Sequence, residues 1–155
     1  MTNPVSSASR ADSEETFLVE INIPSDLDLV SMIVDLGTSL AALKGFGSED
    51  ISAVRLAIHE TLVNAIVYGN EGKPDARVKI KFYLKGDCFY TDIEDEGEGF
   101  DPGILPDPTS PENLLNVHGR GIFLVQNLTE NFSVRKLPEK GMRVTFCRLK
   151  RPDKR

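Results

Sequence analysis

The chain has 155 residues, of which 40% are hydrophobic and 27% charged, and its formal net charge is −6. This length and balance are typical of a single globular domain that encloses its own core. The acidic balance, with no stripe of Lys and Arg, argues against nucleic acid as a partner. No uninterrupted apolar run approaches the roughly 18 residues that cross a bilayer, so we expect no membrane segment.

Two cysteines, Cys88 and Cys147, fall in strand-like segments. The chain has only two histidines, and no Cys/His spacing resembles that of a zinc site. The simplest interpretation is a pair of buried free thiols in a reducing cytoplasm. We therefore expect a cytoplasmic protein.

The two ends of the chain differ in composition from its middle. Residues 1–15 are rich in Ser, Ala and acidic side chains and lack the apolar stretch of a signal peptide. This segment is predicted to be a disordered tail. Residues 150–155 are almost all charged or proline, which predicts a second, short tail. One domain is expected between them, over residues 16–149.

The N-terminal half predicts one strand and two helices. Residues 17–23 alternate between apolar and other positions, as a strand does, and the run stops at a proline. The spacing of the next apolar residues predicts a helix that is capped by Ser25 or Asp26 and runs to about Lys44. A second amphipathic helix is expected over residues 48–69, with its last residue, a glycine, as the C-terminal cap.

The C-terminal half predicts a hairpin, a long loop, a helix and a second hairpin, over residues 78–94, 96–117, 119–128 and 132–149. A loop this long inside a compact domain is usually functional or mobile. Because the strands come as adjacent hairpins, the sheet should be mixed or antiparallel, with the helices on one face. The fold class is therefore α+β, as a two-layer sandwich.

The second helix carries a glutamate and an asparagine one turn apart. Glu60 and Asn64 share one helical face and border its buried side. An asparagine oxygen can bind Mg²⁺, which prefers oxygen ligands and keeps several waters. A carboxylate one turn away could accept a proton from an attacking hydroxyl. Taken alone, the pair fits better as solvent-facing polar residues on an ordinary amphipathic helix.

A first glycine-rich stretch follows the second strand of the hairpin. Asp95 stands at the end of that strand, where its carboxylate could accept a hydrogen bond from the exocyclic amine of adenine. Gly97 and Gly99 would let the backbone approach a planar base. Pro102 stands where a dinucleotide-binding fingerprint would need a glycine, so that motif is excluded. An acidic turn without a ligand is the ordinary alternative.

A second glycine-rich stretch precedes the third helix. Gly119, Arg120 and Gly121 stand at its start, where free N–H groups and the positive end of the helix dipole bind phosphate. The arginine adds a charge that suits phosphate oxygens. His118 is more readily a loop residue than a catalytic base.

The ordered set is far more specific than its parts. On the segments HETLVNAIVYGN, DIEDEGEGFDP, HGRGIFLVQNL and GMRVTF, the chain resembles the Bergerat-fold ATPase/kinase superfamily. Within it, the chain resembles the anti-sigma-factor serine/threonine kinases, over about residues 17–149. Chaperone, topoisomerase, mismatch-repair and histidine-kinase members need further domains, for which this chain has no space.

The resemblance implies a role for each matched residue. Asn64 would be the Mg²⁺ ligand and Glu60 the general base. Asp95 would hydrogen-bond adenine, and Thr145 would lie near it. Glycines 97 and 99 would line the base. Residues 119–121 would contact the phosphates of ATP. Residues 101–118 would form the ATP lid. The family often has histidine where this chain has Tyr68, a position not expected to do chemistry.

The resemblance also implies an activity and partners. The expected function is ATP-dependent phosphorylation of a serine or threonine on a small anti-anti-sigma protein of the STAS type. The same protein would sequester a sigma factor, and the family is commonly homodimeric. Two alternatives stay open: a switch protein that binds ATP without catalysis, and a histidine-kinase-like enzyme that acts on a histidine in trans.

Overall fold

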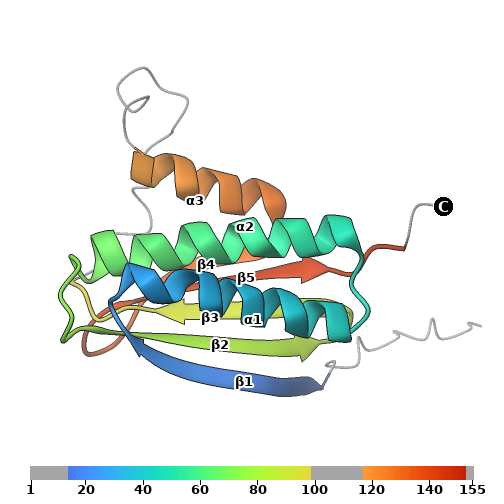
Figure 1. Cartoon of the computed structure of the whole chain (residues 1–155), viewed down its shortest axis with the longest axis horizontal. Helices are drawn as coiled ribbons and strands as arrows, with labels where there is room; N and C mark the ends of the chain where they lie inside the picture. The colour runs from blue at the N-terminus through green and yellow to red at the C-terminus, as the bar shows by residue number, and fades with distance from the viewer. Residues whose placement is uncertain (1–13, 99–116, 153–155) are drawn as a thin grey trace, which may run out of the picture.

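The computed structural model describes residues 14–98 and 117–152 (Figure 1). Its elements, in chain order, are β1 (Glu15–Pro24), the 3₁₀ turn η1 (Leu27–Leu29), α1 (Val30–Leu43), α2 (Ser48–Asn64), the π-helix η2 (Ala65–Gly69), β2 (Arg77–Lys85), β3 (Cys88–Glu94), α3 (Val117–Leu128), β4 (Glu130–Lys136) and β5 (Met142–Leu149). The expected order of strands and helices is confirmed.

The five strands form one sheet in the order β1-β2-β3-β5-β4. Each of the four pairings between these strands is antiparallel, which settles the choice between a mixed and an antiparallel sheet. The three helices lie side by side over one face of the sheet, with α2 between α1 and α3 (Figure 1). The predicted α+β sandwich of two layers is confirmed.

The first helical segment begins with a cap. The Asp26 carboxylate accepts a hydrogen bond of 2.9 Å from the backbone N–H of Asp28. Of the two candidate caps, Asp26 therefore fills the role, because its oxygen satisfies an N–H group that the first turn leaves without a partner. The Ser25 hydroxyl instead donates to the carbonyl of Ala76, at 2.6 Å, and ties this corner to the start of β2.

The second helix does not end as expected. After Asn64 it widens into the π-helix η2, in which the N–H of Asn70 donates to the carbonyl of Ala65, five residues back, at 2.8 Å. Gly69 is not a left-handed C-terminal cap, because its φ is not positive. Isolated π turns inside helices are frequent at functional sites.

The core fills the space between the sheet and the helices. Apolar side chains of α1 and α2 meet those of β2, β3 and β5, and the largest fully buried members include Ile33, Ile58, Leu62, Phe82, Phe89 and Phe146. Residues 48–69 are long and apolar enough, by length and composition, to cross a membrane, and 44% of the relevant stretch is buried here. Such a helix can also be a core helix of a soluble protein, and here apolar side chains of α2 belong to the hydrophobic core.

The ends of the described chain are better anchored than the sequence indicates. Glu15 already pairs with Lys85, so β1 begins two residues before the predicted strand. The N–H of Lys150 donates to the carbonyl of Asp87, at 2.8 Å, and the first residues of the charged C-terminal segment are therefore bound to the domain. Residues 1–13 lie outside the described part of the chain.

Both cysteines are free thiols, as expected, but only Cys147 is buried and Cys88 is half-buried. Cys147 is fully buried, and this burial, together with the neighbouring Cys88, raises the pKa of the Cys147 thiol to about 12. Because the thiolate is the reactive form, Cys147 stays inert at neutral pH.

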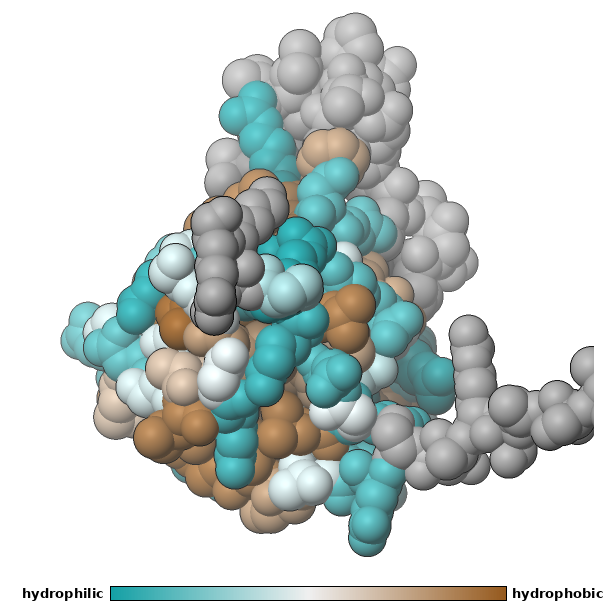
Figure 2. All heavy atoms as spheres, turned by 90° about the vertical axis from the view of Figure 1, so that its right-hand side faces the viewer, coloured by the Kyte–Doolittle hydropathy of each residue, from teal (hydrophilic) through white to brown (hydrophobic). Residues whose placement is uncertain are grey.

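Apolar side chains reach the surface at the end of the sandwich where α1 ends and β1 begins. Figure 2 looks onto this end and shows hydrophobic patches broken by hydrophilic side chains. Leu43, the last residue of α1, is 80% exposed, and Phe17 of β1 is 57% exposed. The opposite end carries the site described below.

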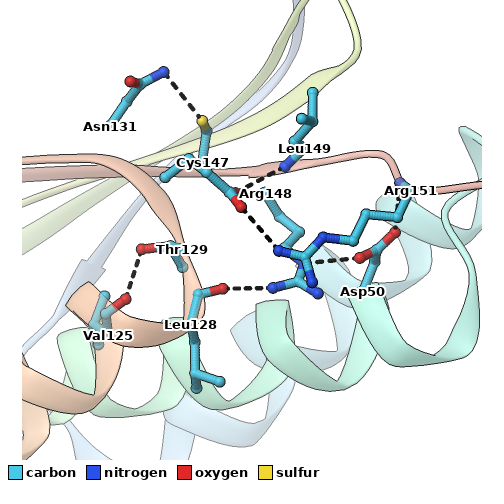
Figure 3. A network of polar contacts seen from close by, with 10 residues as sticks. Asp50, Val125, Leu128, Thr129, Asn131, Cys147, Arg148, Leu149 and Arg151 are labelled. Atoms are coloured by element: carbon cyan, nitrogen blue, oxygen red, sulfur yellow. Dashed lines mark hydrogen bonds and ion pairs between the residues drawn. The ribbon is translucent and has the colours of Figure 1, made fainter.

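A buried ion pair joins the start of α2 to β5. The guanidinium Nε of Arg148 donates to Oδ1 of Asp50, at 2.8 Å, and both side chains are at most 5% exposed. The same guanidinium donates to the carbonyl of Leu128 at the end of α3, and the N–H of Arg151 donates to the second carboxylate oxygen (Figure 3). One arginine therefore fixes the C-terminal end of α3 against α2 and the sheet.

Removing this ion pair is expected to destabilise the fold strongly. Asp50→Ala leaves the Arg148 charge buried without its carboxylate and should lower the free energy of unfolding by about 3–5 kcal/mol. The exposed pair of Asp35 and Arg55, with N and O 3.0 Å apart, is the matched control. Asp35→Ala should change stability by less than about 1 kcal/mol. Urea unfolding followed by circular dichroism measures both, and equal losses would contradict the assignment.

Candidate functional site

A cavity of about 220 Å³ opens between the helices and the sheet, at the end where α2 gives way to η2. Most of its wall is apolar, from β3, β4, β5 and α3: Ile93, Phe132, Met142, Val144 and Ile122. Its polar side chains come mainly from the α2–η2 segment and from the end of β3. Asn64 and Asp95, which the sequence places 31 positions apart, both line this one cavity.

Asp95 is held rigidly in the cavity wall. It is 9% exposed, and its Oδ1 accepts hydrogen bonds from the N–H groups of Gly97, at 2.9 Å, and Met142, at 3.3 Å. Burial raises the pKa of the Asp95 carboxyl above its ordinary value, and these two hydrogen bonds partly oppose the shift. Both of these bonds go to Oδ1, so among the described residues Oδ2 is the carboxylate oxygen that remains to receive a donor from a ligand.

Three glycines allow the backbone to crowd around this carboxylate. A Cβ at Gly97 would lie 1.9 Å from the carbonyl oxygen of Gly69, and a Cβ at Gly69 would lie 2.5 Å from Oδ2 of Asp95. Gly141, with a φ of +99°, would place a Cβ 1.8 Å from the Asp95 carbonyl oxygen. The sequence predicts that Gly97 lines the base. The structure shows a second reason for glycine at this position, which is the close approach of the Gly69 carbonyl oxygen. The roles of Gly69 and Gly141 were missed from the sequence.

Glu60 and Asn64 face the third helix together. A Cβ at Gly121 of α3 would lie 2.9 Å from Oε2 of Glu60 and 3.3 Å from Nδ2 of Asn64. The absence of a side chain at Gly121 therefore lets α3 approach these two polar groups closely. The Nδ2 atom of Asn64 is buried and has no hydrogen-bond partner among the described residues. Glu60 lies beside the cavity and does not line it.

His59 lies closer to Glu60 than the helical wheel indicates. Its Nδ1 is 3.6 Å from Oε1 of Glu60, and the side chains are 52% and 29% exposed. The sequence places the two about 100° apart around the helix, which predicted that they face different ways. The long glutamate side chain bridges that angle.

The segment that the sequence predicts to bind phosphate is helical here. α3 begins at Val117, two residues before the predicted helix, so Gly119, Arg120 and Gly121 lie inside its first turns and not at its very start. Arg120 is exposed to solvent. Gly99 and most of the expected lid, residues 101–116, lie outside the described part of the chain.

Gly121→Ala is expected to separate stability from function. Alanine is the better helix former by about 1 kcal/mol, so α3 should not be destabilised by its own propensity. The new methyl group would press on the ends of Glu60 and Asn64 and occupy the space beside them. We expect phosphoryl transfer from ATP, the activity that the family resemblance implies, to fall at least tenfold while the melting temperature stays within a few degrees. Calorimetry and a radiolabel assay on the same preparation would test this, and unchanged turnover would contradict it.

Thr145 does not belong to the cavity, which corrects the expectation from the sequence. Its hydroxyl donates to Oδ1 of Asp92, at 2.8 Å, on the face of the sheet away from the helices. Side chains of a strand alternate between faces, so Met142 and Val144 of β5 reach the cavity while Thr145 points away. The same alternation, counted from the glycine before Met142, was available in the sequence.

The cavity fits an adenine nucleotide with magnesium. Its apolar wall suits a planar base, and Asp95 offers a single oxygen for an amino group. The volume is below the roughly 300–1,000 Å³ of pockets that enclose a complete ligand, so the phosphates would extend towards Asn64 and α3. The buried Nδ2 atom of Asn64 has no hydrogen-bond partner among the described residues, and a flip of the amide would place its oxygen there as a ligand for Mg²⁺.

Comparison with known proteins agrees with this geometry. Residues 23–148 match the family described as histidine kinase-like ATPase domain. The chain is 26% identical over 143 residues to the serine-protein kinase RsbW of Staphylococcus aureus strain USA300, with 88% of each chain covered. It is 20% identical over 119 residues to the serine-protein kinase RsbW of Listeria innocua, covering 73% of this chain and 76% of that protein.

A solved structure shares the fold. The crystal structure of the RsbU and RsbW domains of Rv1364c from Mycobacterium tuberculosis superposes with a TM-score of 0.57 and 17% sequence identity. The match covers 87% of this chain and 34% of that longer one. The matched family spans most of the chain, including the α2 segment, Asp95 and α3. The chain therefore belongs to the histidine kinase-like ATPase domain family and, within it, is similar to serine-protein kinases of the RsbW type.

Proposed function

We propose that this protein is an ATP-dependent serine/threonine kinase that phosphorylates a small anti-anti-sigma protein of the STAS type. One observation carries the proposal: a single cavity has the Asp95 carboxylate in its wall and Asn64 on its helical side, with Glu60 one turn away. A pocket that only binds nucleotide has little use for a carboxylate at the position of Glu60, one helical turn from the expected metal ligand.

The base end of the pocket would be specific for adenine. Oδ2 of Asp95 would accept a hydrogen bond from the exocyclic amine of the base. Ile93 and Val144 would cover its apolar faces. Guanine presents a carbonyl oxygen in place of that amine, and two acceptors would repel each other.

The phosphate end would combine positioning with charge. Asn64 would contribute one oxygen ligand to Mg²⁺, with phosphate oxygens and water as the remaining ligands. Bound Mg²⁺ would offset negative charge on the phosphates. Arg120 and the N–H groups of Gly119 and Gly121 would provide further positive charge, once the first turns of α3 rearrange towards the ligand.

Glu60 would act on the acceptor hydroxyl. Its carboxylate is 29% exposed and can therefore be reached by a partner protein. It would orient the serine or threonine hydroxyl and accept its proton as the phosphoryl group is transferred. His59, 3.6 Å from that carboxylate, would help to hold it in place.

Sequestration of a sigma factor, homodimerisation and a cytoplasmic location complete the proposal. They are supported by similarity to the RsbW serine-protein kinases alone. Binding of an isolated sigma factor to the full chain, with and without ATP, would test the first of these.

Two measurements test the kinase proposal. Isothermal calorimetry should detect ATP binding that requires Mg²⁺ for full affinity, and no binding to the folded chain would end the case. Radiolabel transfer to a co-purified STAS-type protein should give an acid-stable phosphoserine or phosphothreonine. Binding without transfer would favour a non-catalytic switch, and an acid-labile product would favour transfer to histidine.

A further inference from the structure

A second asparagine, Asn70, lies six residues beyond Asn64 and has no part in the proposed chemistry. It is more deeply buried than any polar side chain that lines the cavity. Asn70 follows the π-helix η2 and is 2% exposed. It does not line the cavity. A buried polar side chain is expected to be fully hydrogen-bonded, and the identity of its partners shows what it holds together.

Asn70 joins three segments that are distant in the sequence. Its Nδ2 donates to Oγ of Ser25, at 2.8 Å, and to the carbonyl of Arg77, at 3.0 Å. Its Oδ1 accepts from the backbone N–H of Glu96, at 2.8 Å. The donor side therefore holds the corner where β1 and β2 pair, and the acceptor side holds the segment that follows β3.

The acceptor side reaches the site directly. Glu96 lies between Asp95, which carries the base-reading carboxylate, and Gly97, whose N–H donates to that carboxylate. The N–H of Met142 holds Asp95 from the sheet, and Asn70 holds the adjacent peptide from the helix. The sheet therefore holds the carboxylate directly, and the helical layer holds the peptide next to it.

The π turn places Asn70 for this role. Its own N–H donates to Ala65, five residues back, so the helix gains one residue per turn just where it meets the segment after β3. The preceding residue, Gly69, brings its carbonyl oxygen to within contact of Gly97. The helix end and the Asp95 segment are therefore in contact through Gly69 and Gly97, and a hydrogen bond from Glu96 to Asn70 joins them.

We propose that Asn70 is a positioning residue that fixes the orientation of Asp95 and so sets the affinity and base selectivity of the nucleotide site. This inference rests on the proposed function. It goes beyond it by assigning adenine recognition to a side chain that does not touch the ligand. The alternative is that Asn70 only stabilises the fold. The two interpretations can be separated because the donor bonds and the acceptor bond of Asn70 can be disturbed by different substitutions.

The test compares Asn70→Ala with Ser25→Ala. The first variant removes the bond to the Glu96 N–H, and the second removes one partner on the donor side and leaves that bond intact. Both should lower the melting temperature. Calorimetric titration with ATP and with GTP, in the presence of Mg²⁺ and well below either melting temperature, gives the dissociation constants. The ratio of the two constants does not depend on the fraction of folded protein.

We expect Asn70→Ala to raise the dissociation constant for ATP about tenfold, as for the loss of one buried hydrogen bond, and to reduce the preference for ATP over GTP. Ser25→Ala should leave the dissociation constant for ATP and the preference for ATP over GTP within about twofold of wild type. An unchanged ATP preference in Asn70→Ala, or an equal change in Ser25→Ala, would overturn the inference. If Asn70→Ala does not fold, Asn70→Ser, whose shorter hydroxyl cannot span both sides, takes its place under the same criteria. Absence of ATP binding by the wild type would instead refute the proposed function.

Discussion

Glu60→Gln is expected to lower the rate of phosphoryl transfer by about 10²–10⁴-fold, the usual contribution of a positioned acid–base group. The amide keeps the size and shape of the side chain, so its contact with Gly121 should persist. The affinity for ATP should stay within a few-fold of wild type, because Glu60 does not line the cavity. The initial rate of radiolabel transfer to the partner protein, at saturating ATP, measures the effect.

The same chemical change at Glu49 is the control. This residue is exposed in the first turn of α2, several turns from the site on the same helix. Glu49→Gln should transfer phosphate at the wild-type rate. If Glu60→Gln also transfers at that rate, Glu60 is not the base, while a joint loss of ATP binding would show that the variant disturbs the pocket itself.

Much of the fold was predictable because its signals are local. Alternation and helical spacing identified each strand and helix, and hairpin order identified the layers. Asn64 and Asp95 could be paired only through the family resemblance, since no local rule says that the end of one helix meets the end of a particular strand. The structure brings both to one cavity.

What escaped the sequence depends on backbone geometry and on contacts between distant segments. The π turn at residues 65–69 has no residue signature, so the sequence predicts an ordinary C-terminal cap at Gly69. In the sequence, Asn70 is only a polar residue beside a turn. Its role becomes visible when the structure shows its three hydrogen-bond partners, which come from three different segments. Thr145 was misplaced for a different reason, because a match to a motif was preferred to the alternation of the strand that carries it.

Asp95→Asn is expected to weaken ATP binding by about ten- to a hundredfold without lowering stability at neutral pH. The amide oxygen can keep the hydrogen bonds from Gly97 and Met142, so the cavity wall should be preserved. The amide nitrogen would then replace Oδ2 and oppose the adenine amine, donor against donor. Loss of a hydrogen bond to a charged group corresponds to about 1.5–3 kcal/mol.

The effect on stability has a definite sign. Burial raises the pKa of Asp95, so the folded protein holds the proton more tightly than the unfolded chain does. The stability that this group contributes is complete below the ordinary aspartate pKa of about 3.9 and is lost as pH rises through the higher, folded value. At pH 7 the wild type therefore bears a desolvation penalty that asparagine avoids. Asp95→Asn should be at least as stable as wild type there, and its advantage should shrink as the pH falls towards 4.

Asp92→Asn separates this effect from the general consequence of losing a carboxylate in β3. Asp92 lies on the other face of the sheet, where it accepts hydrogen bonds from Tyr83, at 3.1 Å, and Thr145, at 2.8 Å. The control should bind ATP as the wild type does, with equal or lower stability at pH 7. Calorimetry and thermal melts from pH 4 to 8 give both quantities for the three proteins. If Asp95→Asn bound ATP normally, the carboxylate would not read the base, and if it melted well below wild type at pH 7, the buried charge would be a stabilising one.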